Sequence, residues 1–455
     1  MPNRFFGTAD FYKKALMIGL PVMVQQLIQN MVSLIDNFMV AGLGDIKMSG
    51  VNITGQILFV FMVLMNAICM AGGIFMTQFY GAGDKRGMKQ IFCFKIVIAG
   101  ASVLLYLFVC MVVPRTFLSL MVMGNSQSAA ILDVAEEYMR LMGLIGLPMM
   151  ISSLIASSLR EIGEVKWPLV ISVIATCINT FLNWVLIYGN LGAPRLEVRG
   201  AAFATITARV AEMLFYLIYM YKVKPPFMIG LSELFHIDFA LFGRILKKGY
   251  LVLFSEMLWV VSETITTALY NGRGGADVVS GMASSFAIAN LYFVAFGGIT
   301  TATGVLIGKT LGAGDLEEAK RQKNWMLSAA VVFGLFMMVF GLATVLLVPI
   351  VFGSLSANAQ TICKQMVFMM SLFMPAWVYV NTQFAVSKSG GDTVMGAVVD
   401  GAVTICLIIP GIFLMAFYTN WGPVMMYAMV KSVDVIKIIV AQIWLGKELW
   451  VRNLT

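Results

Sequence analysis

Long apolar runs recur along the whole chain and are separated by short polar segments. Each run is close to the ~20 residues that an α-helix needs to cross the hydrocarbon of a bilayer. The strict alternation typical of a membrane β-barrel is absent from these runs. The pattern therefore predicts an all-α integral membrane protein with twelve transmembrane helices, at about 15–40, 50–77, 91–113, 134–158, 167–189, 199–222, 244–270, 278–309, 325–349, 362–387, 393–418 and 421–445.

The composition fits a membrane protein and argues against an enzyme. Of the 455 residues, 60% are hydrophobic and 12% are charged, which is about half the charged share of a soluble protein. The single histidine, His236, and the cysteines form no metal-binding or catalytic spacing. We therefore expect no catalytic residue and no cofactor. The six cysteines are predicted to be small buried hydrophobic residues: Cys69, Cys93, Cys110, Cys177, Cys363 and Cys406.

Basic residues concentrate on one side of the predicted helices. With a cytoplasmic N-terminus, the inner segments hold most of the 31 Lys and Arg, including Lys85, Arg86, Lys89 and Lys95, and the outer loops hold five. Because cytoplasmic loops carry such an excess, we expect both termini in the cytoplasm. We therefore attribute the net charge of +8 to the topology of a protein in a lipid bilayer, and we expect no nucleic-acid partner. The polar start has no A-x-A-like site, so no cleaved signal peptide is expected.

The chain contains an internal repeat. GAGD occurs at 81–84 and again at 312–315, and two weaker matches follow at similar offsets, Gly163 with Gly391 and Pro148 with Pro375. Each half holds six predicted helices, so the halves run the same way through the membrane around a central cleft. We expect an N-terminal lobe at 1–222, a cytoplasmic linker at 223–243 and a C-terminal lobe at 244–455. GAGD lacks the Lys-Ser/Thr of a phosphate-binding loop, which argues against ATP hydrolysis.

These motifs resemble the multidrug and toxic compound extrusion (MATE) family over both halves of the chain. The segments that carry the resemblance are GLP at 19–21, DNFMVAGLGD at 36–45, QFYGAGD at 78–84, LREIGEVKWP at 159–168, IGKTLGAGDLEEAK at 307–320 and SKSGGDT at 387–393. The resemblance implies a monomeric, ion-coupled antiporter of the bacterial inner membrane. It would expel small, often cationic organic compounds against inward Na⁺ or H⁺ by alternating access of two lobes.

Two other transporter classes remain open at this point. GAGDKRGMK is similar to the loop between helices 2 and 3 of major facilitator-type drug/H⁺ antiporters, although its glycine spacing is one residue short. Lipid-linked saccharide flippases of the related superfamily are a second alternative, but they usually have more helices and more charged residues in the cleft. A membrane-embedded enzyme would need a clustered nucleophile or metal set.

The first predicted helix carries a polar stripe that ends in an acid. Gln25, Gln29, Ser33 and Asp36 lie on one helical face, and a carboxylate at membrane depth is a functional candidate by default. Pro21 removes a hydrogen bond from the same helix and is a predicted hinge. The stripe can alternatively serve as interhelical hydrogen bonds without a transport role.

The resemblance implies a cation-coupling site in the N-terminal lobe, formed by Asp36, Asn179, Asn183 and Thr205. Asn179 and Asn183 are one turn apart on one helix. Several oxygens with one compensating charge suit a hard monovalent cation. Some relatives have Asp in place of Asn183, so this chain keeps one carboxylate. Na⁺ and a proton at Asp36 are therefore both open, and no metal other than such a Na⁺ is expected.

The C-terminal lobe offers further acids at membrane depth. Glu256 resembles an acid found in many relatives and, with Gln29 and Asp400, is predicted to bind substrate or a second coupling ion. Glu263 lies on the same face as Glu256, without a family counterpart. Thr266 aligns with Asp36 in the repeat, so the lobes are chemically unequal. Charged residues three apart on one helix are predicted to form structural ion pairs. One set is Arg209 with Glu212, and the other is Asp434 with Lys431 and Lys437.

Overall fold

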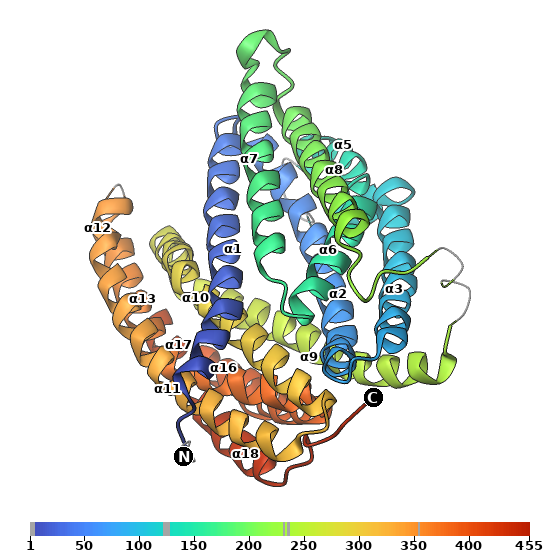
Figure 1. Cartoon of the computed structure of the whole chain (residues 1–455). Helices are drawn as coiled ribbons and strands as arrows, with labels where there is room; N and C mark the ends of the chain where they lie inside the picture. Colours follow the sequence, from blue (N-terminus) through green and yellow to red (C-terminus); the bar gives the residue numbers. More distant parts are fainter. Residues whose placement is uncertain (1–4, 122–127, 231–232, 234–236, 354) are drawn as a thin grey trace. The chain divides into compact units, whose positions relative to one another are not determined.

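The regular structure of the chain is helical wherever it is described (Figure 1). The computed structural model describes residues 5–121, 128–230, 233, 237–353 and 355–455, so His236 lies outside the described ranges. The predicted all-α fold is confirmed. The helices are α1 (Ala9–Ala41), α2 (Asp45–Gly81), α3 (Lys85–Met111), α4 (Pro114–Met121), α5 (Ser128–Gly143), α6 (Gly146–Glu161), α7 (Lys166–Tyr188), α8 (Glu197–Val223), α9 (Phe239–Asn271), α10 (Ala276–Gly312), α11 (Leu316–Thr344), α12 (Val348–Val351), α13 (Ala357–Ser389), α14 (Thr393–Met395), α15 (Gly401–Val403), α16 (Ile409–Tyr418), α17 (Pro423–Ser432) and α18 (Asp434–Gly446).

Eleven of the twelve predicted spans agree with described helices that could cross a bilayer. In the described ranges, ten helices are long and apolar enough to cross a bilayer, and the pair α5 and α6, bent by 51°, adds an eleventh. The twelfth predicted span, 421–445, corresponds to α17 and α18, which break at Val433. All twelve predicted segments are therefore helical. The last one is not among the spans, because the break divides it into helices of 10 and 13 residues, each shorter than the ~20 residues that a helix needs to cross a bilayer.

The contacts divide the chain into two compact units. Unit 1 contains Met1–Met23, Thr77–Asp84 and Leu246–Thr455, and unit 2 contains Val24–Met76 and Lys85–Ile245. The start of α1 and the end of α2 thus pack with the second half of the sequence. The division into lobes at 1–222 and 244–455 with a linker between them stays a prediction.

The eleventh predicted span is a helix with two wide turns. Residues 393–418 form α14, a π-helical turn Gly396–Asp400 (η4), α15, a second π-helical turn Thr404–Ile408 (η5) and α16. Pro410 stands in the first turn of α16, where its ring would clash with the carbonyl four residues earlier. A π turn relieves such a clash by adding a residue to the turn. Asp400 lies at the end of η4.

Within unit 1, the two copies of the GAGD segment pack against each other through backbone atoms. A Cβ at Gly81 would lie 2.0 Å from the Lys309 carbonyl oxygen, and a Cβ at Gly312 would lie 1.8 Å from the Gln78 carbonyl oxygen. Gln78 and Lys309 occupy equivalent positions in the repeat, as do Gly81 and Gly312. The contact is therefore reciprocal, as between two copies related by a twofold axis.

Replacing Gly312→Ala should destabilise the protein, because the added methyl group meets backbone that cannot move aside. Overpacking of this kind costs about 1–3 kcal/mol. Gly304→Ala on the same helix is the matched control, since a Cβ there meets nothing within 4 Å and alanine favours a helix. Thermal unfolding of the detergent-solubilised variants should show a lower midpoint for Gly312→Ala only. Equal midpoints for the two variants would contradict the close contact.

A buried ion pair in unit 2 contains Lys95, which the charge pattern assigned to a basic inner segment. Lys95 lies in α3 and is fully buried. Its ammonium contacts the two Glu161 carboxylate oxygens at 2.8 and 2.6 Å, Ser158 Oγ at 3.1 Å and Ser157 Oγ at 3.3 Å. The lysine therefore fixes α3 to α6 through a neutralised, buried ion pair.

The segment between α8 and α9 folds back on α3. Phe227 is fully buried, with its ring 5.1 Å from that of Phe92. The Lys89 ammonium lies 2.8 Å from a Glu233 carboxylate oxygen. This hydrogen bond, helped by one from the Gly230 backbone, holds the pKa of Glu233 below its usual range.

The cysteines are all free, as predicted, but they are not all buried. Cys69, Cys93, Cys110 and Cys363 are buried, whereas Cys177 and Cys406 are exposed. The prediction of burial was wrong for these two. Both lie in helices apolar enough to span a membrane, and a cysteine behaves as a small hydrophobic residue there.

Candidate functional site

In unit 2, α1 and α7 bring an acid and an amide together. The Asn183 side-chain NH₂ donates a hydrogen bond to Asp36 Oδ1 at 2.9 Å. Asn183 is only 3% exposed, and among the described residues its Oδ1 atom has no hydrogen-bond partner. A buried oxygen left in this state favours a site that is completed by a further donor or a cation.

The remaining two predicted residues form a second contact on the next helix. The Asn179 side-chain NH₂ lies 3.4 Å from Thr205 Oγ1 on α8, and the Thr205 hydroxyl donates to the Ala201 carbonyl at 3.0 Å. Asn179 and Asn183 are one turn apart on α7 and share a face. The structure thus places the four residues as two bonded pairs that join α1 to α7 and α7 to α8.

The chemistry of this group suits a single positive charge. It offers one carboxylate, two amide oxygens and one hydroxyl. Among the described residues, no cluster of three or more His, Cys, Asp or Glu could hold a metal ion. Divalent ions prefer more carboxylates than are present here. A monovalent cation or a proton is the ligand that the donor set fits.

The rest of the α1 stripe is divided between buried and exposed positions. Gln25 is 8% exposed, and the Gln29 side-chain NH₂ donates to Ser172 Oγ on α7 at 2.9 Å. α1 runs without interruption through Pro21. The boundary between the two compact units falls between Met23 and Val24, two residues after this proline.

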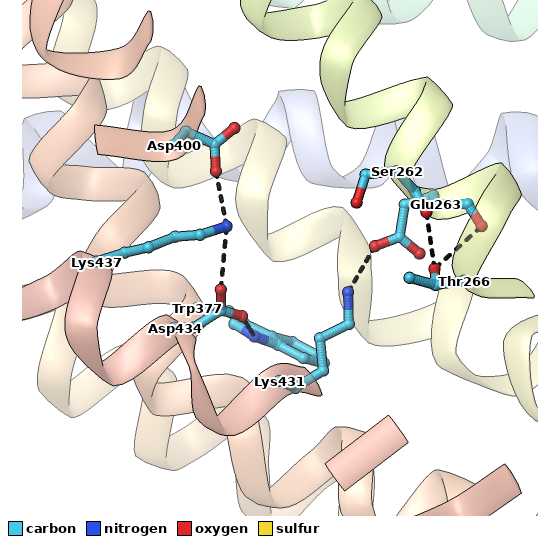
Figure 2. Close-up of polar contacts among 8 residues, drawn as sticks. All are labelled: Ser262, Glu263, Thr266, Trp377, Asp400, Lys431, Asp434 and Lys437. Atoms are coloured by element: carbon cyan, nitrogen blue, oxygen red, sulfur yellow. Dashed lines mark hydrogen bonds and ion pairs between the residues drawn. The ribbon is translucent and has the colours of Figure 1, made fainter. Parts of the chain in front are cut away.

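Unit 1 contains a separate group of polar contacts between helices (Figure 2). Lys431 on α17 lies 2.5 Å from Glu263 on α9. Its ammonium is also 5.9 Å from the ring centroid of Trp377 and 5.5 Å from that of Tyr427. A carboxylate and two aromatic faces thus stabilise this buried charge.

A second lysine in unit 1 is shared by two carboxylates. The Lys437 ammonium lies 2.7 Å from Asp400 Oδ1 and 3.1 Å from Asp434 Oδ1 (Figure 2). The Trp377 indole NH donates to Asp434 Oδ2 at 2.9 Å. Both oxygens of Asp434 are therefore hydrogen-bonded, whereas the bond to Asp400 uses one oxygen.

The predicted structural pairs are partly right. Arg209 lies 2.8 Å from Glu212, as predicted. Lys437 does contact Asp434, but Lys431 pairs with Glu263 on another helix instead. Sequence spacing showed the contacts along one helix and could not show those between helices. Glu256, predicted to bind substrate or an ion, lies 3.9 Å from Lys388 on α13.

Membrane-spanning helices in two repeat halves, with an acid in the first helix, are the architecture of a membrane transporter. The MatE family model matches residues 21–185 and 252–414. The chain therefore belongs to the MatE family, and its resemblance to that family is confirmed. The match favours this family over the major facilitator class.

Relatives and solved structures agree with this assignment. A probable multidrug resistance protein NorM of Thermotoga maritima is 24% identical over 338 residues, which cover 70% of this chain and 68% of that protein. The structure of the MATE transporter VcmN of Vibrio cholerae matches with a TM-score of 0.85 at 17% identity, covering 97% of this chain and 99% of the other. A MOP superfamily transporter of Pyrococcus furiosus gives 0.81 at 18% identity, with 96% and 95% covered. The protein is thus a multi-span membrane protein of the bacterial NorM type.

Proposed function

We propose that this protein exports small, often cationic organic compounds across the bacterial inner membrane in exchange for inward Na⁺ or H⁺. The observation that carries the proposal is the Asp36–Asn183 pair, whose buried amide oxygen has no partner among the described residues. Membership of the MatE family supports the efflux class. A single carboxylate with neutral oxygens supports exchange of one positive charge in each cycle.

In the proposed cycle, substrate is bound while Asp36 is ionised. Na⁺ or H⁺ arriving from outside neutralises Asp36 and favours the conformation that releases substrate. Asn183 positions the carboxylate and offers its own oxygen, and Asn179 and Thr205 extend the donor set. Ion and substrate must favour opposite access states, and each must then weaken the binding of the other by the same factor.

Further roles are proposed for residues outside this group. Glu256, Gln29 and Asp400 bind substrate or a second coupling ion. Pro21 acts as a hinge in α1, supported by the unit boundary that falls two residues after it. The lobes at 1–222 and 244–455 alternate access around the linker 223–243, with both termini cytoplasmic. The protein works as a monomer.

Efflux from proteoliposomes under separately imposed Na⁺ and pH gradients tests this proposal. With the membrane potential clamped, at least one inward gradient should drive export of ethidium, and dissipating that gradient should stop it. The gradient that works identifies the ion. Export that persists without either gradient, or that needs ATP, would contradict ion-coupled antiport.

A further inference from the structure

The segments that follow α8 and α18 share three features, although their sequences differ. Each begins with a non-glycine residue in the left-handed region, Lys224 at φ 50° and Glu448 at φ 56°. Each then buries an aromatic side chain completely, Phe227 in unit 2 and Trp450 in unit 1. Left-handed backbone is costly for such residues and persists only where surrounding contacts hold it. We call the second segment, residues 447–455, the strap.

The third shared feature is an ion pair that ties each segment to the third helix of its own half. Lys89 on α3 lies 2.8 Å from Glu233, and Lys320 on α11 lies 2.9 Å from Glu448. Lys89 and Lys320 occupy equivalent positions in the repeat. This part of the arrangement is therefore duplicated scaffold, as are the reciprocal glycine contacts.

The strap also contacts the first half of the sequence, through Gln78 near the end of α2. The Gln78 side chain is fully buried. Its NH₂ group donates to the Ser389 and Arg452 carbonyls at 2.7 and 3.2 Å. Its Oε1 accepts from the Leu454 backbone NH at 2.7 Å. All four residues lie in unit 1, so one amide joins the end of α2 to the end of α13 and to the strap.

The strap lies very close to both copies of the repeat motif. Gly390 lets its backbone pass, because a Cβ there would overlap with the Trp450 carbonyl. The Asn453 side chain donates to the Gly312 carbonyl at 3.5 Å. The strap thus reaches Gln78, just before the first GAGD, and Gly312, within the second.

We infer that the strap is a latch, which holds the end of α2 to the second half of the chain and must release Gln78 during transport. The end of α2 belongs to the first half by sequence but packs within unit 1. When two halves alternate access, hydrogen bonds between them have to break at one stage of the cycle. Each such bond contributes a modest net free energy, so the tie can open reversibly. The need for release rests on the proposed function, whereas the tie itself does not.

Two variants release the strap in different ways. Gln78→Leu removes the amide and keeps a side chain of similar length. Leu454→Pro keeps Gln78 and removes the backbone NH that it accepts. Gln90→Leu is the matched control, because Gln90 Oε1 accepts the Asp238 backbone NH at 2.9 Å in the same way but within the first half. Thermal unfolding of each purified variant identifies any that fail to fold.

Hydrogen–deuterium exchange of the full-length protein in detergent measures release of the strap. Gln78→Leu should speed exchange of residues 447–455 about tenfold or more, as for the loss of a few net hydrogen bonds. Leu454→Pro should change it in the same direction by less, and Gln90→Leu should leave it at the wild-type rate. Wild-type exchange of the strap in both folded release variants would overturn the inference.

A reducible crosslink separates a latch from a purely structural contact. Gln78→Cys/Leu454→Cys, joined by a bifunctional methanethiosulfonate, should keep ethidium binding, lose ethidium efflux in proteoliposomes and regain efflux on reduction. Gln90→Cys/Asp238→Cys, joined in the same way, should transport before and after reduction. Wild type treated with the same reagent controls for the six native cysteines.

Full efflux with the strap crosslinked would overturn the latch, because the tie would then never need to open. Equal arrest in both crosslinked variants, or arrest that reduction does not reverse, would overturn it as well. Failure of gradient-driven efflux in wild type would refute the proposed function while leaving the exchange result intact.

Discussion

Asp36→Asn should fold and insert but lose gradient-driven efflux. The amide has nearly the size of the carboxylate, but it cannot accept a coupling proton or supply the charge that holds Na⁺. In a one-for-one exchange, a tenfold inward ion gradient supplies about 1.4 kcal/mol and supports about a tenfold substrate ratio. We expect this ratio to fall to about one in the variant, because substrate then only equilibrates. Accumulation of ethidium in inverted vesicles under an imposed gradient measures it.

The same substitution at an exposed position of α1 provides the control for Asp36. Asp10 forms an ion pair with Lys14 at 2.6 Å, and both side chains are more than half exposed. Asp10→Asn should therefore leave efflux unchanged. Full gradient-driven accumulation in Asp36→Asn would refute the coupling role of that residue. Loss of binding and transport together, in a variant with a lowered unfolding midpoint, would instead identify Asp36 as a structural residue.

The unit 2 group shows how far sequence reasoning reaches in a helical membrane protein. The polar stripe of α1 and the pair on α7 follow from helical periodicity alone. Their meeting in space was implied by the family resemblance, and the structure shows Asp36 bonded to Asn183. The sequence could not show that the amide oxygen of Asn183 has no hydrogen-bond partner among the described residues. Whether a polar atom is hydrogen-bonded depends on all of its neighbours in space.

The network of unit 1 was harder to predict, because its contacts join different helices. Spacing along one helix correctly linked Asp434 to Lys437. The same reasoning predicted that Lys431 would pair with Asp434. The structure instead pairs it with Glu263, which is 168 residues away in sequence. A single sequence carries no signal for such a pairing.

The two halves of the chain keep the repeat where they pack and depart from it where they hold charge. The Gly81 and Gly312 contacts are reciprocal, so the duplication is retained in backbone packing. Thr266, aligned with Asp36, donates its hydroxyl to the Ser262 carbonyl at 2.9 Å. The acids of unit 1 come from other positions. Duplication therefore fixed the scaffold, and each half acquired its own ionisable groups.

Lys95→Met should strongly destabilise the protein, because it leaves Glu161 without its ammonium partner in a buried site. Lys95 is 0% exposed and the Glu161 side chain is 13% exposed. Breaking one partner of a buried pair costs about 3–5 kcal/mol. The lysine side chain also packs closely against Gly72, since a Cβ on that glycine would lie 2.5 Å from Lys95 Cε. The unfolding midpoint of the solubilised variant measures the loss.

The double variant Lys95→Met/Glu161→Gln separates the charge from the packing. Removing both charges should recover most of the stability, because a neutral amide at position 161 is stable in a buried site without a counter-ion. The exposed pair Arg140–Glu136, at 2.9 Å with side chains 52% and 21% exposed, is the control. Arg140→Met should change stability by less than about 1 kcal/mol. If the double variant is as unstable as Lys95→Met alone, the lysine acts through its packed stem and not through its charge.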